Sequence, residues 1–376
     1  MHVASSSPSP VTQCVREVRA GGGVCGVAYE LDRALRAGGC QVRNFTLESI
    51  GLRASEPGAG GFYGGKLRLL RDVVAYTILG TLKLKRHADW SHTICHTDAL
   101  FGKVYVNHGL HRAALDASGR KWAMLGRNPL HMFLWIREWV RFNFAVHRHH
   151  VCFSRADAEL LAQYFPKVAA SIRIIPNGVN NERFYPDADM RGQFRAQHSL
   201  VQDDFVLCFV GHEFERKGLA PAIEALSMLP SRVKLVVAGG RGQMLQQAED
   251  TARKQGVQSR VIFLGTVSRI EAVMNGADAL VLPSKFEAWP LVGLEAMACG
   301  LPVLIKPTGG ISEFLFDGVN GFNIQDNGPD IAEKVQRILQ MPAAERAAMS
   351  QAAQRTASQY AWSMIAERYL ALLYED

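Results

Sequence analysis

The second half of the chain alternates short, uninterrupted runs of apolar residues with segments of helical periodicity. The apolar runs fall at residues 204–211, 233–240, 261–265, 277–284 and 302–307. Continuous Val, Ile and Leu runs bounded by Gly or Pro are typical of strands that are buried on both faces. Because a helical pattern follows each run, the sequence predicts a parallel α/β sheet with right-handed crossovers.

The first half shows a similar but less regular pattern. A helix is expected over residues 27–37. The predicted strands lie at 14–18, 41–47, 91–96, 103–109, 149–154 and 171–178. Ligands of such sheets bind at the carboxyl ends of the strands, where loops and helix N-termini collect. We therefore expect two Rossmann-like, doubly wound α/β domains that face a cleft.

The boundary between these domains is predicted from the turn-forming residues that crowd the segment 176–189. We place an N-terminal domain at residues 1–176 and a C-terminal domain at 177–357. A last helix, within residues 358–376, is expected to pack back on the N-terminal domain.

The charge of the chain is unevenly distributed. The 376 residues carry a net charge of +7, and 48% of them are hydrophobic, which excludes a disordered chain. Residues 1–180 hold 23 basic and 12 acidic side chains, whereas the remainder holds 19 and 23. The first half is therefore expected to face an anionic partner, for which a nucleic acid, a membrane surface and a phosphorylated substrate are all compatible.

The cysteines and the N-terminus bear on the compartment. Seven widely spaced cysteines without a C-x-x-C pair argue against a disulfide framework or a structural zinc site, and they fit a reducing cytosol. The polar N-terminus lacks the apolar segment of a signal peptide, and no apolar run is long enough to span a membrane. The sequence thus predicts a cytoplasmic protein.

The segment 283–304 holds the first candidate site. Glu287 lies in a loop, Pro290 stands where a helix would start, and Glu295 follows Glu287 by eight residues. The free amides of residues 291–293 and the helix dipole would form an anion site suited to a diphosphate. One carboxylate can then bind sugar hydroxyls and the other ribose hydroxyls. The alternative is a capping acid followed by a surface glutamate.

A second candidate site lies in the segment 210–226. Here a predicted strand runs into a loop that carries Arg216 and Lys217 before Gly218 and a helix. Two adjacent cations at such a turn can clamp a diphosphate, since Arg binds oxygens in a fork and Lys acts as a point charge. They would also neutralise charge on a leaving group. A solvated basic loop is the alternative.

Four motifs, in their order along the chain, resemble those of the retaining glycosyltransferases of family 4, which have the GT-B fold. They are PNGV (176–179), the G…RKG loop (211–218), the E-x7-E pair with LEAMACGLPVL (287–304) and TGGISEFLFDGVNGF (308–322). The segment VGHEFERKGLAPAIEALSMLP looks most like the lipopolysaccharide-core glucosyltransferases of that family. The resemblance covers most of the chain and is densest in residues 205–325.

The resemblance implies roles for individual residues. Arg216 and Lys217 would hold the donor diphosphate, Glu295 would bind the ribose, and the backbone near Phe263 would contact the base. Glu287 would hold the donor sugar together with the amides that follow it, those of Leu291 and Val292.

In the first half, Gly22 and Gly23 match the glycine loop of the family, although a plain turn is the alternative. His108, in VYVNHG, would contact the donor sugar or orient the acceptor. His111 is the alternative residue for this role, and His96, at the end of the preceding strand, would support His108 without touching the sugar. We expect His108, Glu287, Lys217 and Arg216 to carry catalysis.

The expected reaction transfers a sugar from a nucleotide diphosphate sugar to a hydroxyl of a glycolipid or lipopolysaccharide-type acceptor. The configuration at the anomeric carbon is retained, and the expected nucleotide of the donor is UDP. No residue stands out as a covalent nucleophile, so the family mechanism of front-face displacement is expected. A GDP-mannose-dependent mannosyltransferase and a non-catalytic binder of anionic surfaces are the alternatives.

We expect no cofactor, no metal and no nucleic-acid partner. Asp187 and Asp189 form a D-x-D pair in the interdomain segment, where capping of a helix is the better interpretation.

Two basic segments with apolar centres, residues 66–87 and 128–150, indicate how the first half meets its partner. The second carries five aromatic residues among three arginines, and we assign His147, His149 and His150 to the same basic face. A basic segment with aromatics can lie on an anionic membrane surface. We therefore expect peripheral contact with the cytoplasmic face of the inner membrane. The alternative is that these helices pack on the sheet and expose a charged edge.

Overall fold

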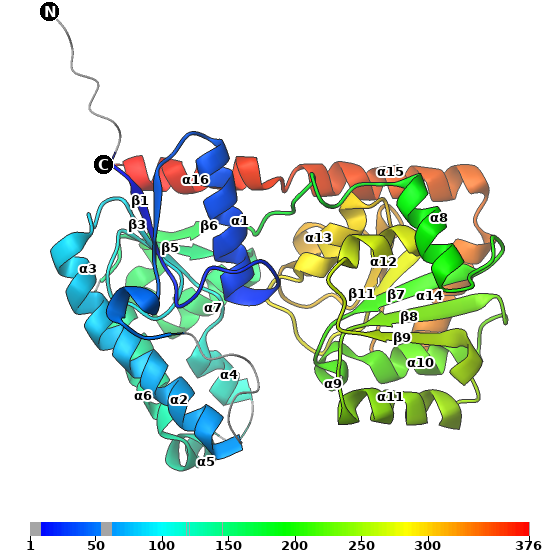
Figure 1. Cartoon of the computed structure of the whole chain (residues 1–376), viewed down its shortest axis with the longest axis horizontal. Coiled ribbons are helices and arrows are strands. Elements are labelled where there is room, and N and C mark those ends of the chain that lie inside the picture. The colour runs from blue at the N-terminus through cyan, green and yellow to red at the C-terminus, as the bar shows by residue number, and fades with distance from the viewer. Residues whose placement is uncertain (1–8, 54–61, 118, 120, 145, 376) are drawn as a thin grey trace, which may run out of the picture. The chain divides into compact units, whose positions relative to one another are not determined.

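The computed structural model describes residues 9–53, 62–117, 119, 121–144 and 146–375 of the chain (Figure 1). The chain divides into two units. The first unit contains residues 1–177 together with residues 362–376, and the second contains residues 178–361. Each unit is built around one six-stranded sheet in which all of the paired strands are parallel.

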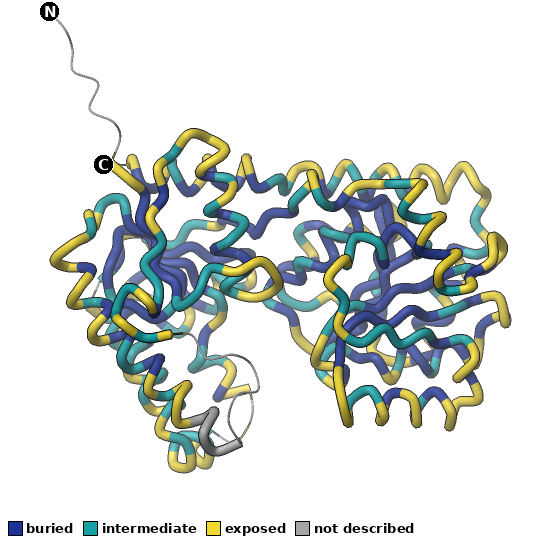
Figure 2. Tube along the Cα trace, viewed as in Figure 1, coloured by how far each residue is buried: buried dark blue, intermediate teal, exposed yellow. Residues whose placement is uncertain are grey.

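The sheet of the first unit has the strand order β2-β1-β3-β4-β5-β6. Its strands are β1 Val11–Cys14, β2 Val42–Phe45, β3 Thr93–Cys95, β4 Val104–Val106, β5 His149–Cys152 and β6 Ile172–Ile174. All residues of β1, β3, β4 and β5 are buried, as the dark tube of Figure 2 shows, because helices cover both faces of a parallel sheet. The first strand ends where we expected it to begin, so the prediction of residues 14–18 was wrong.

The sheet of the second unit has the order β12-β11-β10-β7-β8-β9. Its strands are β7 Phe205–Val210, β8 Val233–Ala238, β9 Val261–Gly265, β10 Ala279–Leu282, β11 Val303–Ile305 and β12 Gly321–Asn323. Each of the five apolar runs of this half therefore forms a strand. The chain adds β8 and β9 on one side of β7 and then returns to add β10 on the other side.

Helices connect the strands in both units. Those of the first unit are α1 Gly23–Ala37, α2 Phe62–Ala75, the π-helix Tyr76–Gly80, α3 Thr81–His87, α4 His111–Ala117, α5 Lys121–Arg127, α6 Pro129–Asn143, α7 Arg155–Tyr164 and α16 Trp362–Tyr374. Those of the second unit are α8 Ala188–Gln197, α9 Phe214–Lys217, α10 Leu219–Ser227, α11 Gln243–Lys254, α12 Ile270–Gly276, α13 Leu291–Ala298, α14 Gly328–Gln340 and α15 Ala343–Ser358. The last helix, α16, packs on α1 although it is remote in the sequence.

Three histidines correct the predicted basic face of the first unit. His147, His149 and His150 are each at most 3% exposed. His149 and His150 lie on β5, which is paired with a strand on each side, and His147 directly precedes this strand region. Burial lowers the pKa of all three, so they are neutral core residues. Two arginines of α6 also point inward: Arg137 pairs with Asp98, and Arg141 donates to backbone carbonyls.

Candidate active site

The loops at the switch points of the two sheets are the positions where doubly wound folds bind ligands. In the second unit, the strand order reverses between β7 and β10, and in the first unit it reverses between β1 and β3. Side chains that follow these strands therefore gather at the carboxyl edge of each sheet. In the second unit the loop after β7 carries Arg216 and Lys217, and the loop after β10 carries Glu287.

The short helix α9 places both cations. Phe214 is buried and anchors its start, and Gly218 ends it with φ +78°, a left-handed conformation that favours glycine. A Cβ atom on Gly218 would come within 2.3 Å of the carbonyl oxygen of Pro283, at the end of β10. The two loops are therefore in backbone contact, and a hydrogen bond from Lys285 N to Arg216 O, 2.8 Å long, joins them again.

Glu287 binds both cations from the opposite loop. Its Oε1 accepts hydrogen bonds from Lys217 Nζ at 2.8 Å and from Ser284 Oγ at 2.9 Å. Arg216 Nη1 lies 3.4 Å from the same oxygen. Glu287 is 8% exposed, and such a buried carboxylate is stable only with close partners. We call these three residues, Arg216, Lys217 and Glu287, the cationic cluster.

The guanidinium of Arg216 is held in a fixed orientation. Its Nε and Nη2 donate to Glu213 Oε2 at 2.9 and 2.7 Å, and its Nη1 donates to the carbonyl of Phe286 at 2.7 Å. Burial acts to lower the pKa of Arg216, but Glu213 and Glu287 outweigh it and raise the pKa. The cluster is therefore a preorganised pair of positive charges beside one acid, which suits a diphosphate.

Glycines allow the loops around the cluster to approach each other. A Cβ atom on Gly211 would lie 2.1 Å from Lys217 Cδ, so the lysine stem crosses directly over that glycine. A Cβ atom on Gly309, where φ is +56°, would lie 2.0 Å from the carbonyl oxygen of Glu287. The TGG motif thus supports the loop that carries the acid.

The helix α13 begins just after the cluster. Pro290 is its N-cap residue, and the amides of Leu291 and Val292 form its first turn. The amide of Gly293 donates to Pro290 O at 3.0 Å, so the prediction that it is free was wrong. Glu295 lies one turn further along α13 and is partly buried.

The remaining predicted contacts lie on other elements of the fold. Phe263 lies on β9, which is separated from β7 by β8 at the edge of the sheet, and it pairs with Val237. Gly22, Gly23 and His108 belong to the first unit.

The glycine loop of the first unit precedes α1. Gly22 is the N-cap residue, and Gly23 has φ +72°. No atom of the described residues lies within 4 Å of a Cβ built on either glycine. The sterically required glycine is Gly26, which we did not predict: a Cβ there would lie 1.7 Å from Gly21 O.

His108 follows β4 and is half-buried. Its Nε2 lies 3.3 Å from Nδ1 of His96, and its ring meets Phe153 edge-on at 5.1 Å. Burial lowers the pKa of His108, and the neighbouring His96 lowers it further. His111, the competitor, instead stacks on His131 with ring centroids 5.1 Å apart.

Two acidic residues have capping roles. Glu138 accepts hydrogen bonds from the backbone of His111 and Arg112 at 2.8 and 2.9 Å, at the start of α4. Asp187 caps α8 through Met190 N, as expected for the D-x-D pair. Among the described residues, no group of three or more His, Cys, Asp or Glu side chains is arranged to hold a metal ion.

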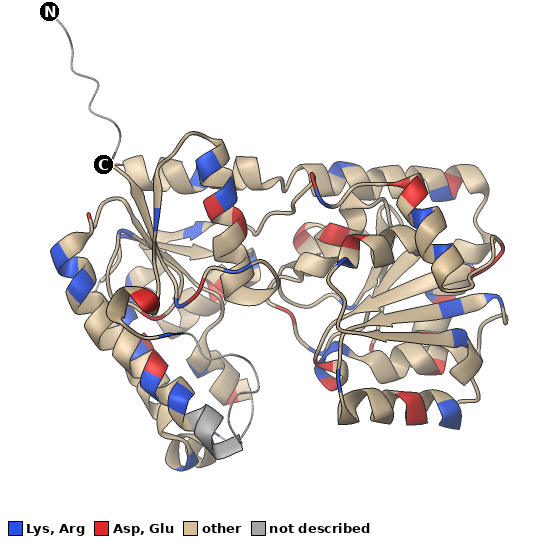
Figure 3. Ribbon diagram, in the orientation of Figure 1, with Lys and Arg blue, Asp and Glu red and all other residues tan. Residues whose placement is uncertain are grey.

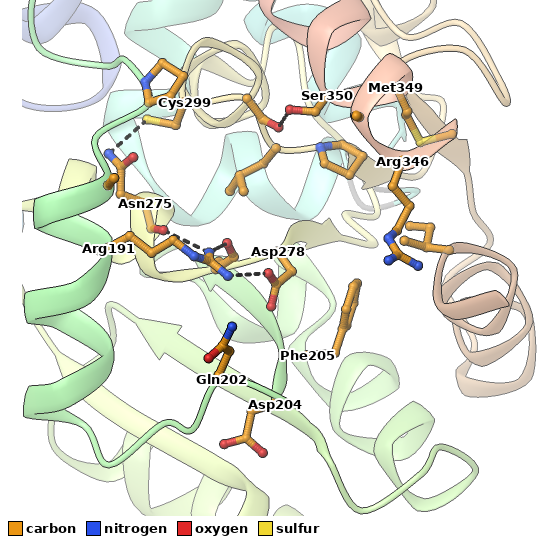
Figure 4. Close-up of a pocket in the computed structure, with 18 of the residues that line it drawn as sticks. Arg191, Gln202, Asp204, Phe205, Asn275, Asp278, Cys299, Arg346, Met349 and Ser350 are labelled. Atoms are coloured by element: carbon orange, nitrogen blue, oxygen red, sulfur yellow. Dashed lines mark hydrogen bonds and ion pairs between the residues drawn. The ribbon is translucent and has the colours of Figure 1, made fainter. Parts of the chain in front are cut away.

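A separate cavity of about 610 Å³ lies in the second unit, beside the N-terminal ends of its strands (Figure 4). Phe205 begins β7, and Asp278 directly precedes β10, so this cavity is at the edge opposite the cationic cluster. Arg191 binds Asp278 at 2.7 Å across it, and Asp278 also accepts from Val206 N. The charged groups at its centre are thus used in joining α8 to the sheet.

Comparison with known proteins identifies the family of the second unit. Residues 190–356 match the family model for "Glycosyl transferases group 1". Residues 190–356, which make up most of the second unit, are thus similar to the group 1 glycosyl transferases. The recognition made from the four motifs is confirmed.

Curated relatives match this chain over part of their length. An uncharacterised glycosyltransferase of Methanocaldococcus jannaschii is 32% identical over 57% of this chain and 56% of its own length. The D-inositol 3-phosphate glycosyltransferase of Xylanimonas cellulosilytica is 30% identical over 58% of this chain and 55% of its own. The chain therefore spans just over half the length of these relatives.

Solved structures extend the likeness to both units. WaaG, a glycosyltransferase involved in lipopolysaccharide biosynthesis, has a TM-score of 0.77 at 21% identity, covering 97% of this chain and all of the other. The sucrose-phosphate synthase of Thermosynechococcus elongatus has a TM-score of 0.75 at 21% identity, covering 97% of this chain and 98% of the other. Anabaena HepE, solved with UDP and glucose, has a TM-score of 0.68 at 18% identity, covering 98% and 100%. The predicted GT-B fold is confirmed.

Proposed function

We propose that this chain is a retaining glycosyltransferase that moves a hexose from a UDP-sugar to a hydroxyl group of an anionic glycolipid. The observation that carries the proposal is the cationic cluster. Arg216 and Lys217 follow β7, they meet Glu287 of the loop after β10, and the first turn of α13 follows directly. Positive charge and unpaired helix amides at a switch point are what a nucleotide diphosphate needs.

The family of the second unit and the solved neighbours support the nucleotide-sugar part. The group 1 model covers the segment that contains the cluster. HepE was solved with UDP-glucose, and glucose is therefore the first sugar to test.

In the proposed reaction, the bond between the anomeric carbon and the diphosphate oxygen breaks while a bond to the acceptor oxygen forms on the same face. The acceptor's proton passes to the departing diphosphate. Lys217 and Arg216 stabilise the negative charge that grows on that leaving group. Glu287 fixes both cations and hydrogen-bonds the sugar, and His108 also contacts the sugar. The protein thus supplies positioning and charge rather than a covalent nucleophile.

The surface of the first unit supports a membrane-associated acceptor. Large apolar side chains are exposed on its helices α2, α5 and α6, at the C-cap of α6 and on the π-helix; they are Leu67, Leu69, Ile78, Leu79, Trp122, Met132, Ile136, Trp139 and Phe144. α2 and α5 both contact α6. Exposed basic residues accompany them on α2 and α3, where Figure 3 shows the blue bands. Aromatic and basic side chains together favour an anionic lipid surface. In the described part of the chain, no helix combines the length and apolarity that a membrane span requires.

A panel of nucleotide sugars tests the function without a known acceptor. We expect slow hydrolysis of UDP-glucose or another UDP-hexose, with release of UDP, and stabilisation of the protein by UDP against heat. GDP-mannose is the comparison. Hydrolysis of GDP-mannose alone would indicate a mannosyltransferase instead of a UDP-sugar-dependent enzyme. If the protein bound none of the nucleotides, the proposed function would be contradicted.

A further inference from the structure

A chain of polar side chains crosses the core of the first unit from the surface of α1 to His108. It consists of Asp32 on α1, Asn44 on β2, Gln13 on β1, His96 after β3 and His108 after β4. Successive polar atoms lie 2.8, 3.5, 2.9 and 3.3 Å apart. Gln13 and His96 are fully buried, so neither can exchange its partner for water. We call this the relay.

The direction of the relay follows from its acidic end. The carboxylate of Asp32 pairs with Arg36 at 2.8 Å and can only accept hydrogen bonds. Asn44 must therefore donate its Nδ2–H to Asp32, which leaves Asn44 Oδ1 facing Gln13.

The orientation of Gln13 is fixed in turn. Its Nε2 lies 3.5 Å from Asn44 Oδ1 and 3.3 Å from the carbonyl of Ala28, both of which are acceptors. A flipped amide would oppose oxygen to oxygen at both contacts. Gln13 Oε1 therefore faces His96 Nε2, at 2.9 Å, and requires a hydrogen on that nitrogen.

The tautomers of the two histidines follow. Burial lowers the pKa of His96 to about 3, so its ring is neutral near pH 7. With the hydrogen on Nε2, Nδ1 of His96 is an acceptor and takes a hydrogen bond from His108 Nε2–H. His108 is then left with a lone pair on Nδ1, an atom that has no hydrogen-bond partner among the described residues.

We propose that Gln13, acting through His96, is a positioning residue that holds His108 in its Nε2–H tautomer, so that His108 Nδ1 accepts a hydrogen bond from a hydroxyl of the nucleotide sugar. This inference rests on the proposed function. An acceptor nitrogen selects a hydroxyl and repels a phosphate oxygen, which a protonated imidazole would attract. The relay therefore directs the sugar, rather than its diphosphate, to this side chain.

Nitrogen-15 NMR of the histidine rings tests the relay without any substrate. In the full chain at pH 7, His96 and His108 should each show a protonated Nε2 and an unprotonated Nδ1. Gln13→Met removes the acceptor for His96 and should reverse both tautomers. The stacked pair His111 and His131, outside the relay, should be unchanged in this variant. An unprotonated Nε2 or a charged ring on His108 in the wild-type protein would overturn the proposal, even if Gln13→Met failed to fold.

Monodeoxyfluoro analogues of UDP-glucose test the consequence. Fluorine cannot donate a hydrogen bond, so one member of the series should be hydrolysed about 10- to 100-fold more slowly than UDP-glucose. That penalty should shrink to nearly nothing in Gln13→Met, while UDP binding stays unchanged. A penalty that persists in Gln13→Met, or a series without any penalty, would refute the role of the relay. Failure to hydrolyse any UDP-sugar would instead count against the proposed function, and the NMR result would still decide the tautomers.

Discussion

Replacing Lys217 by methionine removes one charge from the cationic cluster while keeping a side chain of similar length over Gly211. The lysine is 15% exposed and donates the 2.8 Å hydrogen bond to Glu287. Breaking a fully buried ion pair costs about 3–5 kcal/mol, but Ser284 and Arg216 still contact the acid here, so we expect about 1–2 kcal/mol. For a unit of this size, that lowers the unfolding temperature by roughly 2–8 °C.

The effect of Lys217→Met on activity should be larger. Loss of one group that stabilises leaving-group charge reduces turnover about 10²- to 10³-fold, equivalent to about 3–4 kcal/mol. UDP release from UDP-glucose measures the rate, and circular dichroism checks the fold. Lys285→Met is the matched control, because its side chain is 58% exposed and its ammonium lies 3.4 Å from an exposed carboxylate, that of Glu215. A folded Lys217→Met protein with turnover within about threefold of wild type would refute the assignment.

Three further predictions test other parts of the molecule. Gly309→Ala should destabilise the protein by about 2–4 kcal/mol in urea unfolding, whereas Gly318→Ala, with a similar positive φ and its nearest atom at 4.0 Å, should lose about 1 kcal/mol; equal losses would contradict the predicted clash with Glu287. His96 and His150 have folded pKa values of about 3 against 6.5 when unfolded, so only the unfolded chain takes up protons below pH 6.5. Stability should therefore fall by about 1 kcal/mol per pH unit for each histidine as the pH drops from 6.5 to 5, and an unfolding temperature that stays level or rises would be inconsistent with this. Replacing Trp139 and Phe144 together by serine should weaken sedimentation with anionic liposomes, whereas Trp90→Ser, outside α2, α5 and α6, should not; equal binding by both variants would exclude this surface.

Much of the candidate site in the second unit could be predicted from sequence. The runs that form β7 and β10 are buried on both faces and bounded by Gly or Pro, so their ends, and the loops that hold Arg216 and Glu287, are visible in the residue pattern. The close contact of these loops could not be read in the same way. It depends on Gly218 and Gly309. At both positions a Cβ atom would clash with backbone atoms of a segment that is distant in the sequence.

The first unit was harder to interpret because its chemistry is buried. Its histidines and arginines resembled a basic surface, yet His150 and Arg141 lie in the core with backbone and aromatic partners. A composition count records charge but not the side to which a side chain points.

The order of residues determined the strands, the switch-point loops and the types of side chain that those loops carry, because burial on both faces and turn formation are local properties. Only the tertiary structure decided which of these groups meet. Gln13, Asn44 and Asp32 lie far from His96 and His108 in the sequence. These side chains become hydrogen-bonded neighbours only because the strands pair in the order β2-β1-β3-β4.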